Sequence, residues 1–161
     1  MTKAADLLAL ARTKGVMLTT AESCTGGMLS AAITDIAGSS AIFDRGFVTY
    51  TNAAKIAMLG VKQATLDTFG AVSEQVAAEM AKGALGHSDA DIAVSVTGIA
   101  GPGGSEHKPE GRVCFGLADS TGVITQTVEF GALGRAQVRI AARDHGLDLF
   151  AQSVISKSPT K

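Results

Sequence analysis

The segment TTAESCTGGM, residues 19–28, brings an acid, a thiol, two glycines and several hydroxyls close together. Ser23 is a candidate nucleophile, but a serine needs a neighbouring base to attack a substrate near neutral pH. The three histidines are His87, His107 and His145, and only His107 lies near a glycine-rich loop. Bases for a Ser-His-Asp triad are therefore scarce, and the chain has no G-x-S-x-G turn.

Lysine is the next choice of base, since serine–lysine pairs are a known variant of the triad. Lys55 closes the segment VTYTNAAK (48–55), and the strand before it can end beside the strand before Ser23. Tyr50, the only tyrosine, can orient or relay a proton in the same crevice. A free lysine titrates near ~10.4 and serves as a neutral base only if burial or a second cation lowers its pKa by roughly three units. The spacing alone also allows Lys55 to be a solvated helix residue.

The rest of the first segment offers an oxyanion site and two further reactive groups. The backbone N–H groups of Thr25, Gly26 and Gly27 lie where a helix is expected to begin, and such groups can hold an oxyanion. A tight turn with Thr25 as a helix cap explains the same residues. Cys24 is a rival nucleophile or a small buried packing residue. Glu22 can bind a substrate hydroxyl, cap backbone groups or do neither.

A second glycine-rich stretch, TGIAGPGGSEHKPEG, covers residues 97–111. It is not a nucleotide phosphate loop of the G-x4-G-K type, because Gly104 stands where the lysine is needed. Its backbone and polar side chains can still line a pocket for a phosphorylated ligand. The candidate substrate-binding residues here are Thr97, Gly98, Gly101, Gly103, Ser105 and Lys108. Arg135 and Arg139, four residues apart at the start of a helix, can grip a phosphate or carboxylate, or form an exposed helix face.

Hydrophobic periodicity and turn residues predict the elements that position these groups. Helices are expected over 4–14, 28–36, 52–59 with Asn52 as cap, 73–84 and 135–150, and strands over 16–20, 46–50, 91–96, 112–118 and 123–130. Alternating helices and strands followed by a hairpin predict a three-layer α/β/α fold with a mixed, mostly parallel sheet. Ligands of such sheets gather at the carboxyl ends of strands. A single domain is expected over 1–150, with a frayed tail over 151–161.

Composition and charge argue against several classes of protein, namely nucleic-acid-binding, secreted and membrane-spanning proteins. The formal charge of −1 argues against a large nucleic-acid footprint. No segment resembles a signal peptide or a membrane span. Cys24 and Cys114 have no metal-ligand spacing and are expected to stay reduced. The sequence therefore indicates a soluble cytoplasmic protein without a membrane or nucleic-acid partner, and no motif in it calls for a metal or a cofactor.

Six ordered motifs together resemble the CinA C-terminal domain family, the nicotinamide-nucleotide amidases also called PncC. The motifs are TAESCTGG (20–27), GSSAIFDRGFVTYTNAAK (38–55), LGV (59–61), GAVSEQVAAEMA (70–81), TGIAGPGG (97–104) and KPEGRV (108–113). The resemblance runs from about residue 5 to residue 150. The chain departs from the family pattern at GALGRAQVR (131–139), which lacks the usual acidic residue, and at KPEG, where KPVG is common.

The resemblance implies a metal-independent amidohydrolase that converts nicotinamide mononucleotide to nicotinate mononucleotide and ammonia. It places the family nucleophile on Ser23, the base on Lys55 and the motif tyrosine on Tyr50. It also implies the stand-alone form of the domain, with the nucleotide as small-molecule partner, and association into a homo-oligomer. A pyridine-nucleotide-binding module without catalysis and a hydrolase that uses Cys24 are the alternatives. No role is assigned to Glu110.

Overall fold

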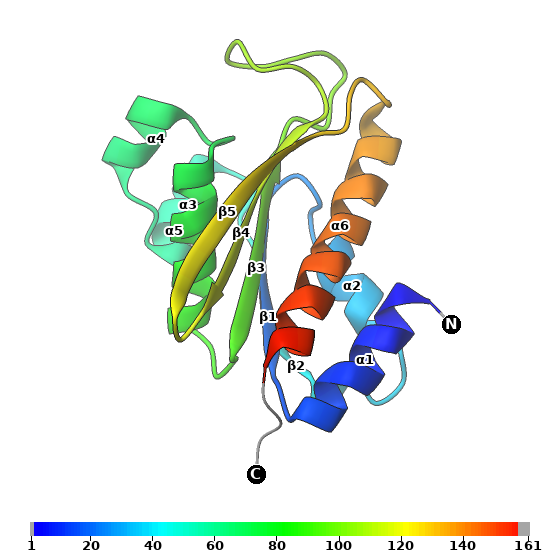
Figure 1. Ribbon diagram of the computed structural model, residues 1–161. Coiled ribbons are helices and arrows are strands. Elements are labelled where there is room, and N and C mark those ends of the chain that lie inside the picture. The colour runs from blue at the N-terminus through cyan, green and yellow to red at the C-terminus, as the bar shows by residue number, and fades with distance from the viewer. Residues whose placement is uncertain (1, 158–161) are drawn as a thin grey trace.

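A five-stranded sheet forms the middle layer of the protein, which is described by a computed structural model over residues 2–157 (Figure 1). The strands are β1 (Leu18–Glu22), β2 (Phe43–Val48), β3 (Ile92–Gly98), β4 (Arg112–Asp119) and β5 (Gly122–Glu129). The helices are α1 (Lys3–Lys14), α2 (Met28–Thr34), α3 (Asn52–Leu59), α4 (Gln63–Phe69), α5 (Glu74–Gly86) and α6 (Arg135–Ser156), with a short 3-10 turn at Ser39–Ala41. None of the helices over residues 2–157 is long and apolar enough to cross a membrane.

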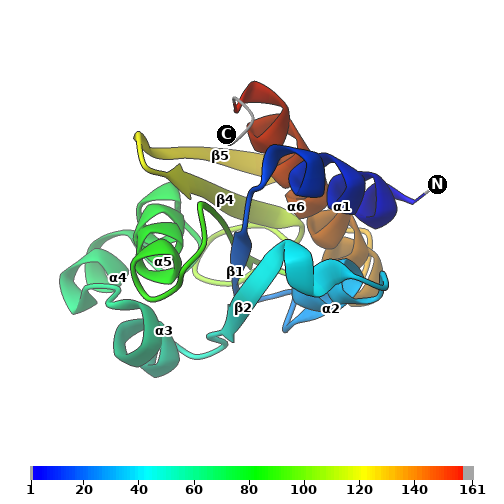
Figure 2. The same ribbon diagram turned by 90° about the horizontal axis from the view of Figure 1, so that it is seen from below.

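The sheet has the order β2-β1-β3-β4-β5. β1 pairs in parallel with both β2 and β3, and the β4–β5 hairpin continues the sheet in antiparallel fashion. Helices α1, α2 and α6 cover one face, and α3, α4 and α5 cover the other, as the views in Figures 1 and 2 show. The predicted three-layer fold with a mixed sheet is therefore confirmed.

The two largest hydrophobic clusters of the described residues hold the layers together, one on each face of the sheet. The first joins the strands to α1, α2 and α6 through residues such as Leu29, Phe115 and Phe150. The second joins them to α3, α4 and α5 through residues such as Leu59 and Met80. All of β1 is buried, which is typical of a central strand covered on both faces. The residue that follows β1 consequently emerges from the most enclosed part of the sheet.

The strands that lead to the candidate catalytic residues differ from their predicted bounds. β1 begins and ends two residues later than predicted, so Glu22 belongs to the strand. β2 ends at Val48, so Tyr50 follows the strand instead of closing it. The pairing of Leu18 with Phe43 and of Glu22 with Val48 determines these limits. Each limit depends on the partner strand, which the composition of one strand does not reveal.

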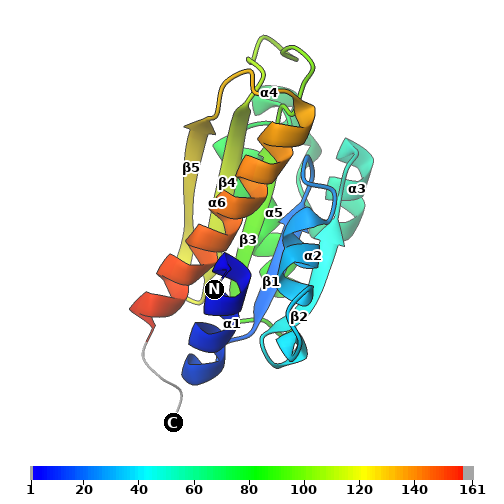
Figure 3. The ribbon, with the colours of Figure 1, turned by 90° about the vertical axis from the view of Figure 1, so that its right-hand side faces the viewer.

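Two helical segments also differ from prediction. α4 was not predicted, and its start is held by Glu79 of α5, whose carboxylate accepts hydrogen bonds from Lys62 N and Thr65 Oγ1 at 2.8 and 2.6 Å. α6 continues to Ser156, where a frayed tail was predicted from residue 151, because Val154 packs into the core. In Figure 3, α6 runs nearly the whole length of the sheet. The remainder of the predicted tail, residues 158–161, lies outside the described residues.

His145 couples α6 to the β4–β5 hairpin. Its ring centroid lies 4.5 Å from that of Phe115, and its Nε2 forms a hydrogen bond with Gln126 Oε1. Burial lowers the pKa of His145, and the charge of Lys3 acts in the same direction, whereas Asp148 opposes it. The unfolded chain therefore binds a proton at His145 more readily than the folded chain does.

We predict that His145 makes the protein less stable as the pH falls below 6.5, the ordinary pKa of histidine. Between pH 7.5 and 5.5, the wild type should lose more free energy of unfolding than His145→Phe does. Phenylalanine keeps the ring packing and cannot titrate. Urea unfolding at both pH values measures the difference, and equal losses in the two proteins would contradict the prediction.

Candidate active site

Ser23 directly follows β1 at the carboxyl end of the sheet. Its N–H donates to Val96 O of β3 at 2.9 Å, which holds the residue beside the neighbouring strand. Gly26 and Gly27 then turn the chain into α2 with φ angles of +56° and +104°, values that side chains rarely allow. The sharp turn leaves the Ser23 hydroxyl at the strand end.

Glu22 fixes the helix that follows this turn. One of its carboxylate oxygens accepts Leu29 N at 2.8 Å, and the other accepts Ser30 N at 3.0 Å and Ser30 Oγ at 2.6 Å. Glu22 is fully buried. Of the three roles open to it from the sequence, the structure shows the capping of backbone groups.

Lys55 reaches Ser23 from the opposite layer. Thr51, and not the predicted Asn52, is the N-cap of α3, and its hydroxyl accepts Ala54 N at 3.1 Å. One turn later, Lys55 Nζ donates to Ser23 Oγ at 3.1 Å and to Tyr50 O at 3.1 Å. The structure thus brings the two predicted catalytic side chains into hydrogen-bond contact.

The environment of Lys55 disfavours its charged form. The side chain is only 1% exposed, and within residues 2–157 no carboxylate forms a salt bridge with it. Burial lowers the pKa of Lys55. A neutral amine in contact with a hydroxyl has the free electron pair that a general base needs. The solvated alternative for Lys55 is excluded by its burial.

Cys24 has the opposite environment for a reactive group. Burial raises the pKa of its thiol to about 12, although Arg139 and Lys55 act against the rise. Because the thiolate is the reactive form, a thiol with this pKa is inert near neutral pH. Lys55 Nζ contacts the Ser23 hydroxyl, and within residues 2–157 it forms no hydrogen bond with Cys24, so the geometry also favours Ser23 as nucleophile.

Tyr50 contacts the Ser23–Lys55 pair through its backbone carbonyl. Its carbonyl accepts from Lys55 and lies 3.5 Å from Ser23 Oγ, whereas its hydroxyl accepts from Arg135 Nη2 at 2.7 Å. Arg135 also donates to Gly101 O at 2.7 Å. A proton relay through the Tyr50 hydroxyl remains a prediction. Arg135 joins the segment after β2, the glycine-rich loop and the start of α6.

A cavity of about 190 Å³ opens beside these groups. It is lined by Ser23, Cys24, Tyr50, Asn52, Lys55, Ala71, Val72, Thr97, Gly98, Ala100 and Arg135. The Thr97 hydroxyl donates to Ala71 O at 2.8 Å, which fixes one wall. Three predicted substrate-binding residues, Thr97, Gly98 and Arg135, thus lie around the predicted nucleophile and base.

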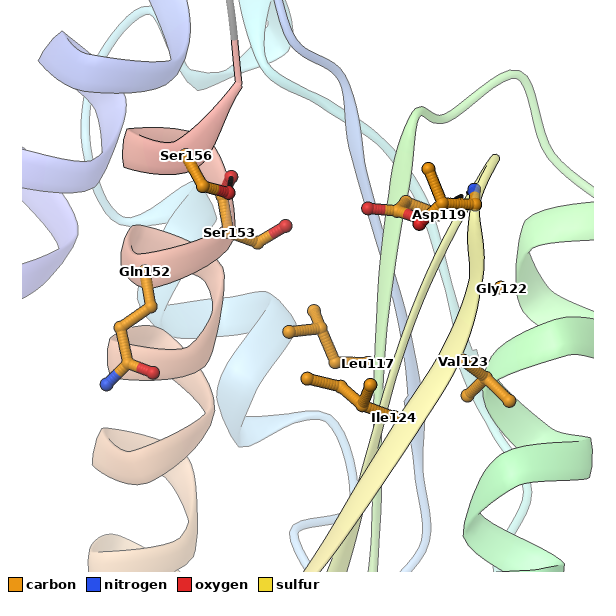
Figure 4. Close-up of a pocket in the computed structure, with 9 residues that line it drawn as sticks. Leu117, Asp119, Gly122, Val123, Ile124, Gln152, Ser153 and Ser156 are labelled. Carbon is orange, nitrogen blue, oxygen red and sulfur yellow. Dashed lines mark hydrogen bonds between the residues drawn. The ribbon is translucent and has the colours of Figure 1, made fainter.

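A larger cavity of about 380 Å³ lies between the β4–β5 turn and the last turns of α6 (Figure 4). Among residues 2–157, Asp119 is the only titratable residue in its lining. The carboxylate of Asp119 already accepts hydrogen bonds from Thr121 and Lys157. This cavity has no paired nucleophile and base, and it is not the candidate active site.

The other predicted substrate-binding residues lie outside the cavity lining. Gly101 adjoins it through the hydrogen bond with Arg135. The Gly103 N–H donates to Glu110, and Ser105 forms a backbone bridge with Lys108. Arg139 donates to the carbonyls of Cys24 and Thr25, so it contacts the nucleophile turn from outside the cavity.

Two residues of the loop have structural contacts that the sequence did not indicate. Glu110 accepts from Gly103 N at 2.7 Å and from Gly134 N at 3.0 Å, which ties the loop to the start of α6. Lys108 Nζ donates to Phe69 O at 2.7 Å and Val72 O at 2.5 Å. The contacts of Glu110 with Gly134 and of Lys108 with Phe69 and Val72 join segments far apart in the chain, so no local pattern indicates them.

Comparison with known proteins identifies the family and several relatives of this chain. The family model described as the CinA C-terminal domain matches residues 1–154. A nicotinamide-nucleotide amidohydrolase PncC of Enterobacter agglomerans is 57% identical over 85% of this chain and 84% of its own length. The protein of the same name from Escherichia coli K12 is 50% identical over 91% of this chain and 90% of its own length.

Solved structures show the same fold. The competence/damage inducible protein CihA of Agrobacterium tumefaciens has a TM-score of 0.88 and 47% identity, covering 97% of this chain and 98% of its own. The competence damage-inducible protein A of Klebsiella pneumoniae has a TM-score of 0.93 and 36% identity, covering 97% of each chain. Together with the family model, these similarities show that the chain belongs to the CinA C-terminal domain family.

Proposed function

We propose that this chain is a nicotinamide-nucleotide amidohydrolase that converts nicotinamide mononucleotide and water to nicotinate mononucleotide and ammonia. The names of the related PncC proteins support the substrate and the reaction. The observation that carries the mechanism is the 3.1 Å contact between the buried Lys55 amine and Ser23 Oγ. This contact has the geometry that is typical of a serine nucleophile and the base that activates it.

The proposed reaction is an acyl transfer in two steps. Neutral Lys55 accepts the proton of Ser23 Oγ as the oxygen attacks the carboxamide carbon. The lysine then gives that proton to the departing nitrogen, so that ammonia leaves and an ester on Ser23 remains. Water attacks the ester with the lysine as base, and the acid and the free serine are released.

The size of the cavity suggests how the nucleotide binds. A volume of about 190 Å³ is below the roughly 300–1,000 Å³ that is typical of pockets for whole drug-sized ligands. In our proposal only the amide-bearing ring enters, and the ribose phosphate stays at the mouth near Arg135. Binding energy from the remote phosphate then orients the amide against Ser23.

Replacement of the two neighbouring nucleophiles separates this proposal from its alternatives. Ser23→Ala should lower the release of ammonia from nicotinamide mononucleotide by about 10³-fold or more. Cys24→Ala should keep most of the wild-type rate, because the thiol is protonated. An ammonia assay of the three proteins measures this. A non-catalytic binding module predicts no ammonia from the wild type, and a cysteine hydrolase predicts that Cys24→Ala is the inactive variant.

Lys55→Met should be less active and more stable than the wild type. Methionine fills a similar volume without an amine, so kcat should fall by about 10²–10⁴-fold. The free energy of unfolding at pH 7 should rise by about 0.5–2 kcal/mol, because a buried amine with a lowered pKa destabilises the folded chain. The unfolded chain binds the extra proton only below pH 10.5, so the gain should shrink as the pH approaches 10.5. Thermal unfolding at pH 7.0 and 9.5 measures it, and a destabilised variant would contradict the prediction.

Arg135 should act on substrate binding. Arg135→Met should raise the KM for nicotinamide mononucleotide by about 10-fold with a smaller change in kcat, since a remote phosphate contact is lost. Tyr50→Phe is the companion variant, because it removes only the hydroxyl that accepts from Arg135. Its kcat should stay within about three-fold of the wild type. A loss of 10²-fold or more in Tyr50→Phe would instead support the proton relay.

A further inference from the structure

Asn52 is a polar residue of the cavity lining to which the proposed mechanism gives no role. The sequence suggested it as the cap of α3, but the hydroxyl of Thr51 fills that role. Asn52 lines the cavity together with Ser23 and Lys55. Its side-chain amide forms no hydrogen bond with any of residues 2–157. The amide therefore keeps its donors and its acceptor for a ligand.

The position of Asn52 on α3 turns it toward the reactive pair. Residues three apart in a helix lie on the same face. Lys55, three residues after Asn52, directs its amine to Ser23 Oγ and Tyr50 O. Helical side chains also lean toward the N-terminus of the helix, which is where Asn52 lies. Asn52 thus shares the face of α3 that supplies the base.

The lining of the cavity has a buried floor and an exposed rim. Ser23 and Lys55 are 8% and 1% exposed and belong to the floor. Tyr50, Asn52 and Arg135 line the same cavity and are exposed, so they form the rim. An amide that reacts with Ser23 has to reach the floor. The part of the substrate that Asn52 contacts is therefore the part that stays at the rim, which is the ribose phosphate.

Asn52 and Arg135 offer different chemistry at this rim. A guanidinium only donates hydrogen bonds, which suits a phosphate, whereas a side-chain amide both donates and accepts, as a hydroxyl does. The Tyr50 hydroxyl already accepts from Arg135. Within residues 2–157, Asn52 carries the only side-chain carbonyl oxygen of the lining, and no carboxylate lines it. A substrate hydroxyl at the rim consequently finds its acceptor at Asn52.

We propose that Asn52 binds the adjacent 2′- and 3′-hydroxyls of the substrate ribose and makes the site specific for a ribonucleotide. This inference rests on the proposed function and adds a second contact to the one between Arg135 and the phosphate. One hydroxyl accepts from the amide NH₂ group, and the other donates to the amide oxygen. A site that hydrogen-bonds a hydroxyl discriminates against an analogue without it, because its own polar group then loses its partner.

Asn52→Ala tests this contact, since alanine is a good helix former and lacks the amide. We expect kcat/KM for nicotinamide mononucleotide to fall by about 10-fold, mostly through KM. For the 2′,3′-dideoxy analogue, the wild type should show a similar loss, and Asn52→Ala should match the wild type within about two-fold. Met58→Ala is the matched control, because Met58 is an exposed residue of α3 outside the cavity lining. It should match the wild type on both substrates in an ammonia assay.

Nicotinamide riboside, which keeps the hydroxyls and lacks the phosphate, separates Asn52 from Arg135. Asn52→Ala should still lower kcat/KM by about 10-fold on this substrate, whereas Arg135→Met should change it by about two-fold or less. The dideoxy analogue, which keeps the phosphate, should give the reverse pattern. A loss in Asn52→Ala that is equally large on the dideoxy analogue would overturn the inference, because the hydroxyls would then not be the contact.

The outcomes also separate the inference from the proposed function. If Asn52→Ala turns over nicotinamide mononucleotide as fast as the wild type, the inference is wrong and the amidase proposal stands. If the wild type releases no ammonia, the amidase proposal is wrong, and calorimetric binding of the nucleotide and its dideoxy analogue decides the inference. Binding to Asn52→Ala that is about 10-fold weaker for the nucleotide alone supports it, and equal binding to both proteins overturns it. A wild type that neither releases ammonia nor binds the nucleotide would overturn both.

Discussion

The buried amine of Lys55 is the constraint on which the rest of the site depends. A lysine that is 1% exposed and has no carboxylate partner within the described residues pays a desolvation penalty when it is charged. It is tolerated because its stem packs between layers and its nitrogen meets Ser23 Oγ and Tyr50 O. A carboxylate at this point would stabilise the fold but would hold the proton on the lysine. The absence of a carboxylate partner among the described residues thus favours the neutral amine, which can act as a base, at the expense of the stability that an ion pair would give.

The topology of the sheet brings this amine to the serine. β1 connects toward β2 on one side, and β3 connects toward β4 on the other, so the order of the strands diverges between β1 and β3. Ligands of open α/β sheets bind at such a switch point, outside the carboxyl ends of the strands. Ser23 follows β1, and Thr97 and Gly98 close β3, and all three line the cavity. The site therefore lies where the fold itself leaves a crevice.

Residue types could predict the pair of side chains but not the backbone around them. The shortage of histidines leaves lysine as the base for Ser23, and family resemblance places it at Lys55. The layers follow from hydrophobic periodicity. The limits of β1 and β2 depend on mutual pairing, and the start of α4 depends on Glu79 from another helix. Contacts of this kind join distant segments, and a local pattern cannot report them.

The partners of the charged residues around the cavity could not be predicted from the sequence either, and these partners bear on how the site works. Glu110, Lys108 and Arg139 each bind backbone atoms of a neighbouring segment, and each looked from the sequence like an unassigned or ligand-binding charge. Charges that are satisfied by the protein's own backbone hold the loop and the turn in place before a substrate arrives. Catalysis by fixed dipoles needs this preorganisation, because donors that are already aligned require no rearrangement as charge develops. Arg135 differs, since its partner is the hydroxyl of an exposed tyrosine at the cavity mouth. Because this contact is exposed, Arg135 is the residue that we propose exchanges the tyrosine hydroxyl for the phosphate of the substrate.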